Sequence, residues 1–90
     1  MPPKTFNLHW GSGIVVEEAS TEGEYKRPTI QLLEFTDGET QGNVQIRFCH
    51  YSKNGAFQRS PLILDVSELA DLRKAIRKCP RLHKLLSRLV

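Results

Sequence analysis

The hydrophobic pattern of this 90-residue chain changes its period at Asp65. Upstream, Val44, Ile46 and Phe48 fall on one side of an extended strand, and the polar residues between them fall on the other side. Downstream, apolar residues recur every three or four positions, as they do on one face of a helix. A helix with one apolar stripe must cover an apolar surface, and the preceding sheet is the nearest one. The pattern therefore predicts an antiparallel sheet followed at once by a helix.

Turn-forming residues divide the chain before Asp65 into strands. The expected strands cover residues 29–36, 43–51 and 57–64, with two shorter ones over 5–10 and 14–18. The dipeptide Asn54-Gly55 is a strong hairpin signal. Pro61 cannot donate a ladder hydrogen bond, so it marks an edge, a bulge or a strand end.

Asp65 stands where a helix N-cap belongs, and Glu68 follows three residues later as its capping-box partner. We expect one long helix over residues 66–78, because the residue before Pro80 avoids the helical region. A second short helix is expected over 80–90. The predicted fold class is α+β: an antiparallel sheet of four to five strands, a C-terminal helix packed across it, and the second short helix. The whole chain, residues 1–90, is expected to form one domain with a disordered tail over residues 1–4.

The second helix carries a leucine stripe. Its members are Leu82, Leu85, Leu86 and Leu89. In a chain this short the core is small, so such a stripe either joins that core or meets another copy of the chain. We predict a homodimer that uses these leucines.

Charge is distributed unevenly along the chain. Residues 1–71 hold six lysines and arginines against ten acids, whereas residues 73–90 hold seven lysines and arginines and no acid. A basic segment is typical of proteins with an anionic partner. It is also typical of a solvated helix end whose cations complement the helix dipole.

Cations and aromatic residues alternate along two expected strands and the segments before them. Proteins that bind single-stranded nucleic acid combine a positive groove with rings on which bases stack. The candidate binding residues are Lys26, Arg27, Arg47, Tyr51, Lys53, Phe57 and Arg59. In the alternative interpretation Phe57 belongs to the core and Arg47 only keeps the sheet soluble.

The order of elements also resembles a known family. The segments that carry the resemblance are Arg47-Phe48-Cys49-His50-Tyr51, Pro61-Leu62-Ile63-Leu64 and Asp65-Val66-Ser67-Glu68-Leu69. Over about residues 28–78 the chain resembles the single-stranded-DNA-binding transcriptional coactivators, positive cofactor four and its bacterial relatives. The resemblance implies a dimer that presents basic and aromatic side chains of curved sheets to unpaired DNA, and a role in transcription regulation.

Other classes of function find little support. The three histidines and two cysteines lack metal-ligand spacing, and no catalytic constellation is recognisable, so we expect no enzyme, metal, cofactor or small-molecule substrate. No 18-residue apolar run or signal peptide is present, which predicts a cytoplasmic protein without a membrane partner. A non-catalytic interaction or oligomerisation module is the alternative to nucleic-acid binding.

Overall fold

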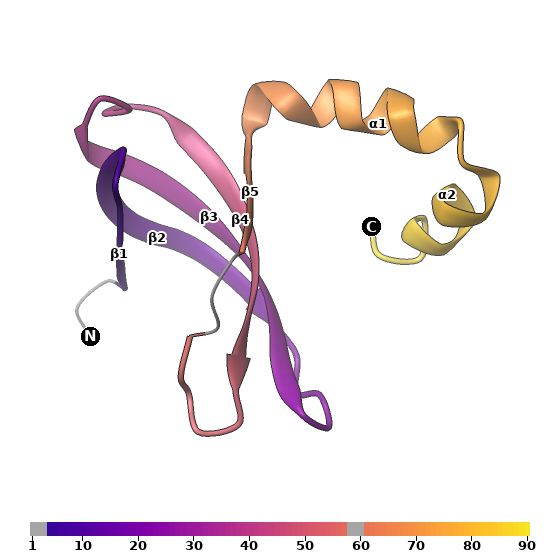
Figure 1. The fold of residues 1–90 in the computed structure, drawn as a ribbon, viewed down its shortest axis with the longest axis horizontal. Coiled ribbons are helices and arrows are strands. Elements are labelled where there is room, and N and C mark those ends of the chain that lie inside the picture. The colour runs from indigo at the N-terminus through magenta and orange to yellow at the C-terminus, as the bar shows by residue number, and fades with distance from the viewer. Residues whose placement is uncertain (1–3, 58–60) are drawn as a thin grey trace.

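The computed structural model describes residues 4–57 and 61–90. In this part of the chain, five antiparallel strands form one meander in sequential order. The strands are β1 (Thr5–Leu8), β2 (Gly11–Ser20), β3 (Lys26–Gly38), β4 (Val44–Ser52) and β5 (Leu62–Asp65). A single 3-10 turn, η1 (Val66–Glu68), leads into α1 (Leu69–Arg77) and then α2 (Pro80–Leu86). The α+β class predicted from the sequence, an antiparallel sheet followed by helices, is confirmed (Figure 1).

The sheet is curled, and β2 contains the irregularities that allow it (Figure 1). Its pairing with β3 shifts register between Ser12 and Gly13 and again between Val15 and Glu17. Such bulges bend a strand and increase its twist. At the first bulge the backbones approach so closely that a Cβ at Gly13 would lie 2.0 Å from the carbonyl oxygen of Glu34. The curl gives the sheet an inner face and an outer face.

The inner face holds the small buried core. Phe6 from β1 and Phe35 from β3 meet edge to face, with ring centroids 4.8 Å apart, and Leu33 lies fully buried beside them. Leu8, Trp10 and Val15 pack around this cluster and remain partly exposed.

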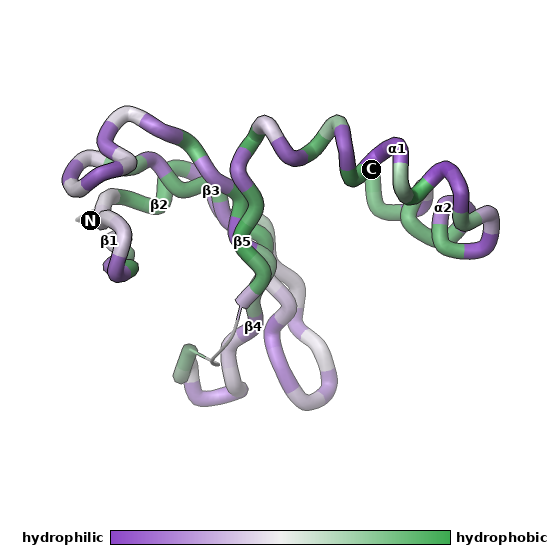
Figure 2. Tube along the Cα trace, turned by 45° about the horizontal axis from the view of Figure 1, so that its top comes forward, coloured by the Kyte–Doolittle hydropathy of each residue, from purple (hydrophilic) through white to green (hydrophobic). Residues whose placement is uncertain are grey.

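The outer face is apolar and only partly covered. It includes Ile30 and Leu32 on β3, Ile46 and Phe48 on β4, and Leu62 and Leu64 on β5, which are matched across the strands by their register. Leu64 is buried. Leu62 remains 55% exposed. Figure 2 shows hydrophobic residues along β5, the edge strand from which the chain continues into the helices.

Residues 66–90 form a helical segment, which we call the arm. Its start follows the prediction: the Asp65 side chain accepts a hydrogen bond from the Ser67 amide, and Glu68 accepts one from the Asp65 amide, which completes the capping box. The arm leaves β5 at the end of the sheet that holds the β3–β4 turn, opposite the end with the β2–β3 turn, and α2 folds back beneath α1 (Figure 1). Neither helix contains a buried residue. The arm thus extends beyond the sheet, and the close packing of the long helix across the sheet that we expected is not seen, because the main contacts of α1 are with η1 and α2.

Two further expectations differ from the structure. The last strand is shorter than 57–64, because Phe57 makes only an isolated bridge to Tyr51 and β5 begins just after Pro61. The expectation of a disordered tail over residues 1–4 is wrong for Lys4, because its carbonyl oxygen accepts a hydrogen bond from the Val15 amide. Residues 1–3 lie outside the described part of the chain. The helices in residues 4–57 and 61–90 lack the length and the apolar character of a membrane-spanning segment.

Candidate nucleic-acid interface

Five of the seven candidate binding residues gather at one end of the sheet. Both the β2–β3 turn and the β4–β5 connection lie there (Figure 1). We call this region the sheet tip; it comprises Tyr25, Lys26, Arg27, Tyr51, Lys53 and Phe57. Register places Lys26 opposite Ser52 and Arg27 opposite Tyr51, so the cations of β3 lie beside the end of β4. The Phe57 ring then meets the Tyr51 ring edge to face, with centroids 5.3 Å apart.

The sheet tip exposes aromatic surface. Tyr25 is 81% exposed and Phe57 is 41% exposed. Tyr25 directly precedes the candidate residues Lys26 and Arg27 in the sequence. Exposed rings beside cations are the surface on which unpaired bases stack.

Arg47 lies elsewhere than expected. Alternation correctly places it on the same side of β4 as Tyr51, but its side chain is only 7% exposed, so the expectation of a solvent-facing Arg47 is wrong. Its guanidinium carbon lies 4.7 Å from the centroid of the Phe57 ring, a cation–π contact. Its Nε donates a hydrogen bond of 2.7 Å to Gln31 Oε1. Arg47 therefore supports Phe57 from beneath instead of reaching solvent.

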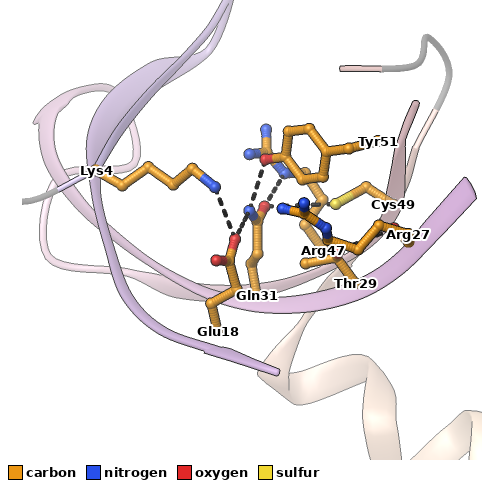
Figure 3. Close-up of polar contacts among 8 residues, drawn as sticks. All are labelled: Lys4, Glu18, Arg27, Thr29, Gln31, Arg47, Cys49 and Tyr51. Atoms are coloured by element: carbon orange, nitrogen blue, oxygen red, sulfur yellow. Dashed lines mark hydrogen bonds and ion pairs between the residues drawn. The ribbon is translucent and has the colours of Figure 1, made fainter. Parts of the chain in front are cut away.

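Gln31 is the centre of a polar network that the sequence analysis missed (Figure 3). Only 1% of Gln31 is exposed, and its Nε2 donates to Glu18 Oε1 at 2.6 Å and to the Tyr51 hydroxyl at 2.9 Å. Its Oε1 accepts from Arg47 and from Cys49 Sγ at 3.6 Å. The sequence signal for this network was the polar Gln31 between the apolar Ile30 and Leu32. A buried amide in such a position normally has hydrogen-bond partners, so it indicates a polar network.

Lys4 and Glu18 close the network at its solvent side. Lys4 Nζ lies 2.9 Å from Glu18 Oε1 and 4.6 Å from the centroid of the Tyr51 ring. The hydrogen bond from Gln31, followed by that from Lys4, lowers the pKa of the Glu18 carboxyl. The hydrogen bond to Glu18 raises the pKa of Lys4. The network thus links the N-terminal residues to the base of the sheet tip.

The cations of the sheet tip differ in their availability. Arg27 Nε lies 2.9 Å from Glu22 Oε1, and Lys53 Nζ lies 4.0 Å from the other oxygen of the same carboxylate. Lys26 is exposed and has no ion pair within the described part of the chain. Arg59, the seventh candidate, lies outside the described residues.

The arm carries the larger share of free positive charge. Its seven cations are all exposed, and none has an ion-pair partner among residues 4–57 and 61–90. They are Arg73, Lys74, Arg77, Lys78, Arg81, Lys84 and Arg88. At 100° per residue, Lys74 of α1 and Lys78, which caps its end, fall opposite Leu72 and Ile76. The arm therefore has an apolar side and a charged side, on which cations predominate and Asp71 is also present.

The predicted dimer leucines are largely uncovered within one chain. Leu82 is 47% exposed, Leu85 and Leu89 are each 60% exposed, and Leu86 is partly buried. α2 holds all but Leu89, which follows its end.

The cysteines and acidic groups show no assembled reactive centre in the described residues. Burial is the main cause that raises the pKa of the Cys49 thiol, which disfavours the thiolate needed of a nucleophile. The described residues contain no group of three or more metal-ligating side chains. Cys79 is exposed at the junction of α1 and α2.

Known proteins add no information about this site. No protein-family model, no curated protein and no solved structure matches the chain.

Proposed function

We propose that the protein is a cytoplasmic, non-catalytic homodimer that binds single-stranded nucleic acid through the sheet tip. The observation that carries the proposal is the exposure of Tyr25 and Phe57 at the end of the sheet that also holds Lys26, Arg27 and Lys53. Rings are costly to leave in water, and base stacking on such rings contributes about 1–3 kcal/mol per base. The resemblance to single-stranded-DNA-binding coactivators makes transcription regulation the process that we propose for this binding.

Charge at the sheet tip suits a phosphate backbone. Lys26 is free to contact a phosphate, while Arg27 and Lys53 share one carboxylate, that of Glu22. A phosphate group can replace that carboxylate as the partner of both cations, since these exposed pairs are weak. The seven cations of the arm add a long-range attraction for a polyanion.

Arg47 acts as a positioning residue in this proposal. Its guanidinium holds the Phe57 ring from the buried side, and Gln31 holds Arg47 in turn. The polar network then gives Phe57 and Tyr51 a fixed orientation, which lowers the entropic cost of stacking a base.

Fluorescence anisotropy with labelled oligo-dT at two salt concentrations tests the proposal. Replacing Tyr25 by Ala should weaken binding by about 1–3 kcal/mol, because this exposed ring would stack a base. Replacing Lys26 by Gln should lower the steepness of the salt dependence by about 0.7, the value of one single-strand phosphate contact.

The matched control is Lys74→Gln on α1, which removes the same charge from an exposed helix position. Equal effects of Lys26→Gln and Lys74→Gln would show that only overall charge matters and that the sheet tip is not the site. Absence of binding by the unaltered chain at low salt would remove the proposal altogether.

A second candidate function is an interaction or oligomerisation module without nucleic acid. The exposed leucines of the arm favour it, because soluble chains rarely leave a continuous apolar stripe in water. Sedimentation of the unaltered chain and of Leu85→Glu, both without nucleic acid, tests self-association directly. A dimer that fails to bind oligo-dT at any salt concentration would favour this second function over the first.

A further inference from the structure

Within residues 4–57 and 61–90 of one copy, two apolar surfaces remain exposed. The first is the outer face of the sheet, where Leu62 is 55% exposed and its apolar neighbours are partly exposed. The second is the leucine side of the arm, where Leu85 and Leu89 are each 60% exposed. Figure 2 shows apolar segments in both places. Exposed apolar surfaces of this kind mark interaction sites.

The arm leaves most of the outer face of its own sheet uncovered. Leu89 is the residue of the arm that lines the groove over Ile30, Phe48 and Pro28, and the groove stays open with a volume of about 530 Å³. A second open hollow of about 580 Å³ continues along the same face over Leu32 and Ile46. The outer face thus offers a long apolar groove that the arm of the same chain leaves unfilled.

Charge indicates what fills this groove. Glu17 and Glu34 lie on the outer side of β2 and β3, where register pairs Glu17 with Leu32 and Glu34 with Val44. Both are exposed, and neither has an ion pair among the described residues. The arm presents leucines flanked by cations and, over residues 73–90, no acid. An apolar groove with an acidic border is complementary to this arm in both hydrophobicity and charge.

We infer that the arm of one copy packs in the outer-face groove of a second copy, and that the exchange is reciprocal. In a two-fold dimer each copy donates one arm and receives one, so both grooves and both leucine stripes are covered at once. The contact closes on itself and leaves no free groove for a third copy. The lysines opposite the apolar side of α1 then face solvent. This dimer is distinct from one in which two arms pair with each other.

A complementation experiment separates the two arrangements, with sedimentation velocity in the absence of nucleic acid. One variant, Leu85→Glu/Leu89→Glu, has a defective arm and an intact groove, and the other, Leu62→Glu, has a defective groove and an intact arm. All three positions are more than half exposed, and circular dichroism of each variant is the check on folding. Tyr25→Glu places the same charge at an exposed apolar position of the sheet tip and serves as the control.

Each defective variant alone should dimerise at least tenfold more weakly than the unaltered chain, whereas Tyr25→Glu should dimerise normally. An equimolar mixture of the two variants should dimerise more tightly than either alone, because the mixed pair contains one intact junction of arm and groove. If Leu62→Glu does not fold, Glu17→Lys/Glu34→Lys replaces it as the groove variant.

Three results would overturn the inference: a monomeric unaltered chain, full dimerisation of the groove variant, or a mixture no tighter than its components. None of these readouts involves nucleic acid. Loss of oligo-dT binding with an intact reciprocal dimer would therefore count against the proposed function alone.

Discussion

Replacing Gln31 by Leu should destabilise the protein more than most single substitutions. Leucine has a similar volume and fits a buried strand position, so the change isolates the loss of hydrogen bonds. Four partners lose a bond at once: the Arg47 guanidinium, the Tyr51 hydroxyl, the Glu18 carboxylate and the Cys49 thiol. Glu18 retains Lys4, so the greatest cost falls on Arg47, which is 7% exposed.

The expected magnitude follows from that burial. A hydrogen bond to a charged group contributes about 1.5–3 kcal/mol, and an unsatisfied buried donor costs about 1–3 kcal/mol. We therefore expect Gln31→Leu to lower the free energy of unfolding by about 2–4 kcal/mol. A domain of this length has a total of roughly 5–13 kcal/mol, so the effect is large.

Urea denaturation at fixed protein concentration measures this change. Trp10 is the single tryptophan, and it packs against the core, so its fluorescence reports unfolding. A double-mutant cycle with Arg47→Met adds a sharper criterion. The double variant Gln31→Leu/Arg47→Met should be less destabilised than the sum of the two single variants, because no buried donor is then left without a partner.

A neutral Gln31→Leu variant would refute the view that this amide holds the sheet together. Strict additivity in the cycle would show that Gln31 and Arg47 stabilise the fold independently, despite the 2.7 Å between Arg47 Nε and Gln31 Oε1.

Three smaller effects are expected elsewhere in the molecule. The pKa of Glu18 is lower in the folded chain than its ordinary value of 4.5. Its contribution to stability should therefore be present above pH 4.5 and be lost as the pH falls further. In a plot of unfolding midpoint against pH, Glu18→Gln should flatten the decline on the acid side. Gly38→Ala should cost roughly 1–3 kcal/mol in urea denaturation, because φ is +92° and the new Cβ would lie 2.7 Å from the Gly11 Cα atom; an unchanged midpoint would contradict this. A thiol reagent at neutral pH should label the exposed Cys79 faster than Cys49, whose pKa is raised by burial, and equal rates measured by mass spectrometry would contradict the placement of Cys49.

Local sequence signals were sufficient for much of the architecture. The change of period at Asp65, together with Glu68, located the start of the helical region, because a capping box acts over three residues. Alternation in β4 placed Arg47 and Tyr51 on the same side of the strand, since that relation depends only on the extended backbone. Neither signal depends on distant parts of the chain.

Local sequence signals could not predict which residues surround each face of the sheet. Arg47 is buried because Gln31 from another strand and Phe57 from beyond the hairpin converge on it, and alternation says nothing about which face a curled sheet encloses. The course of the arm was equally unpredictable, because an amphipathic helix specifies that it needs an apolar partner without specifying where that partner lies.

The sequence by itself therefore determined the succession of strands, the capped turn into the helices and the separation of acidic body from basic arm, all of which arise from neighbouring residues. Only the tertiary structure decided that the inner face holds a hydrogen-bonded network around Gln31, that Tyr25 and Phe57 remain in water, and that the outer face stays open. Those features depend on contacts between residues far apart in the chain, which form only when the sheet curls.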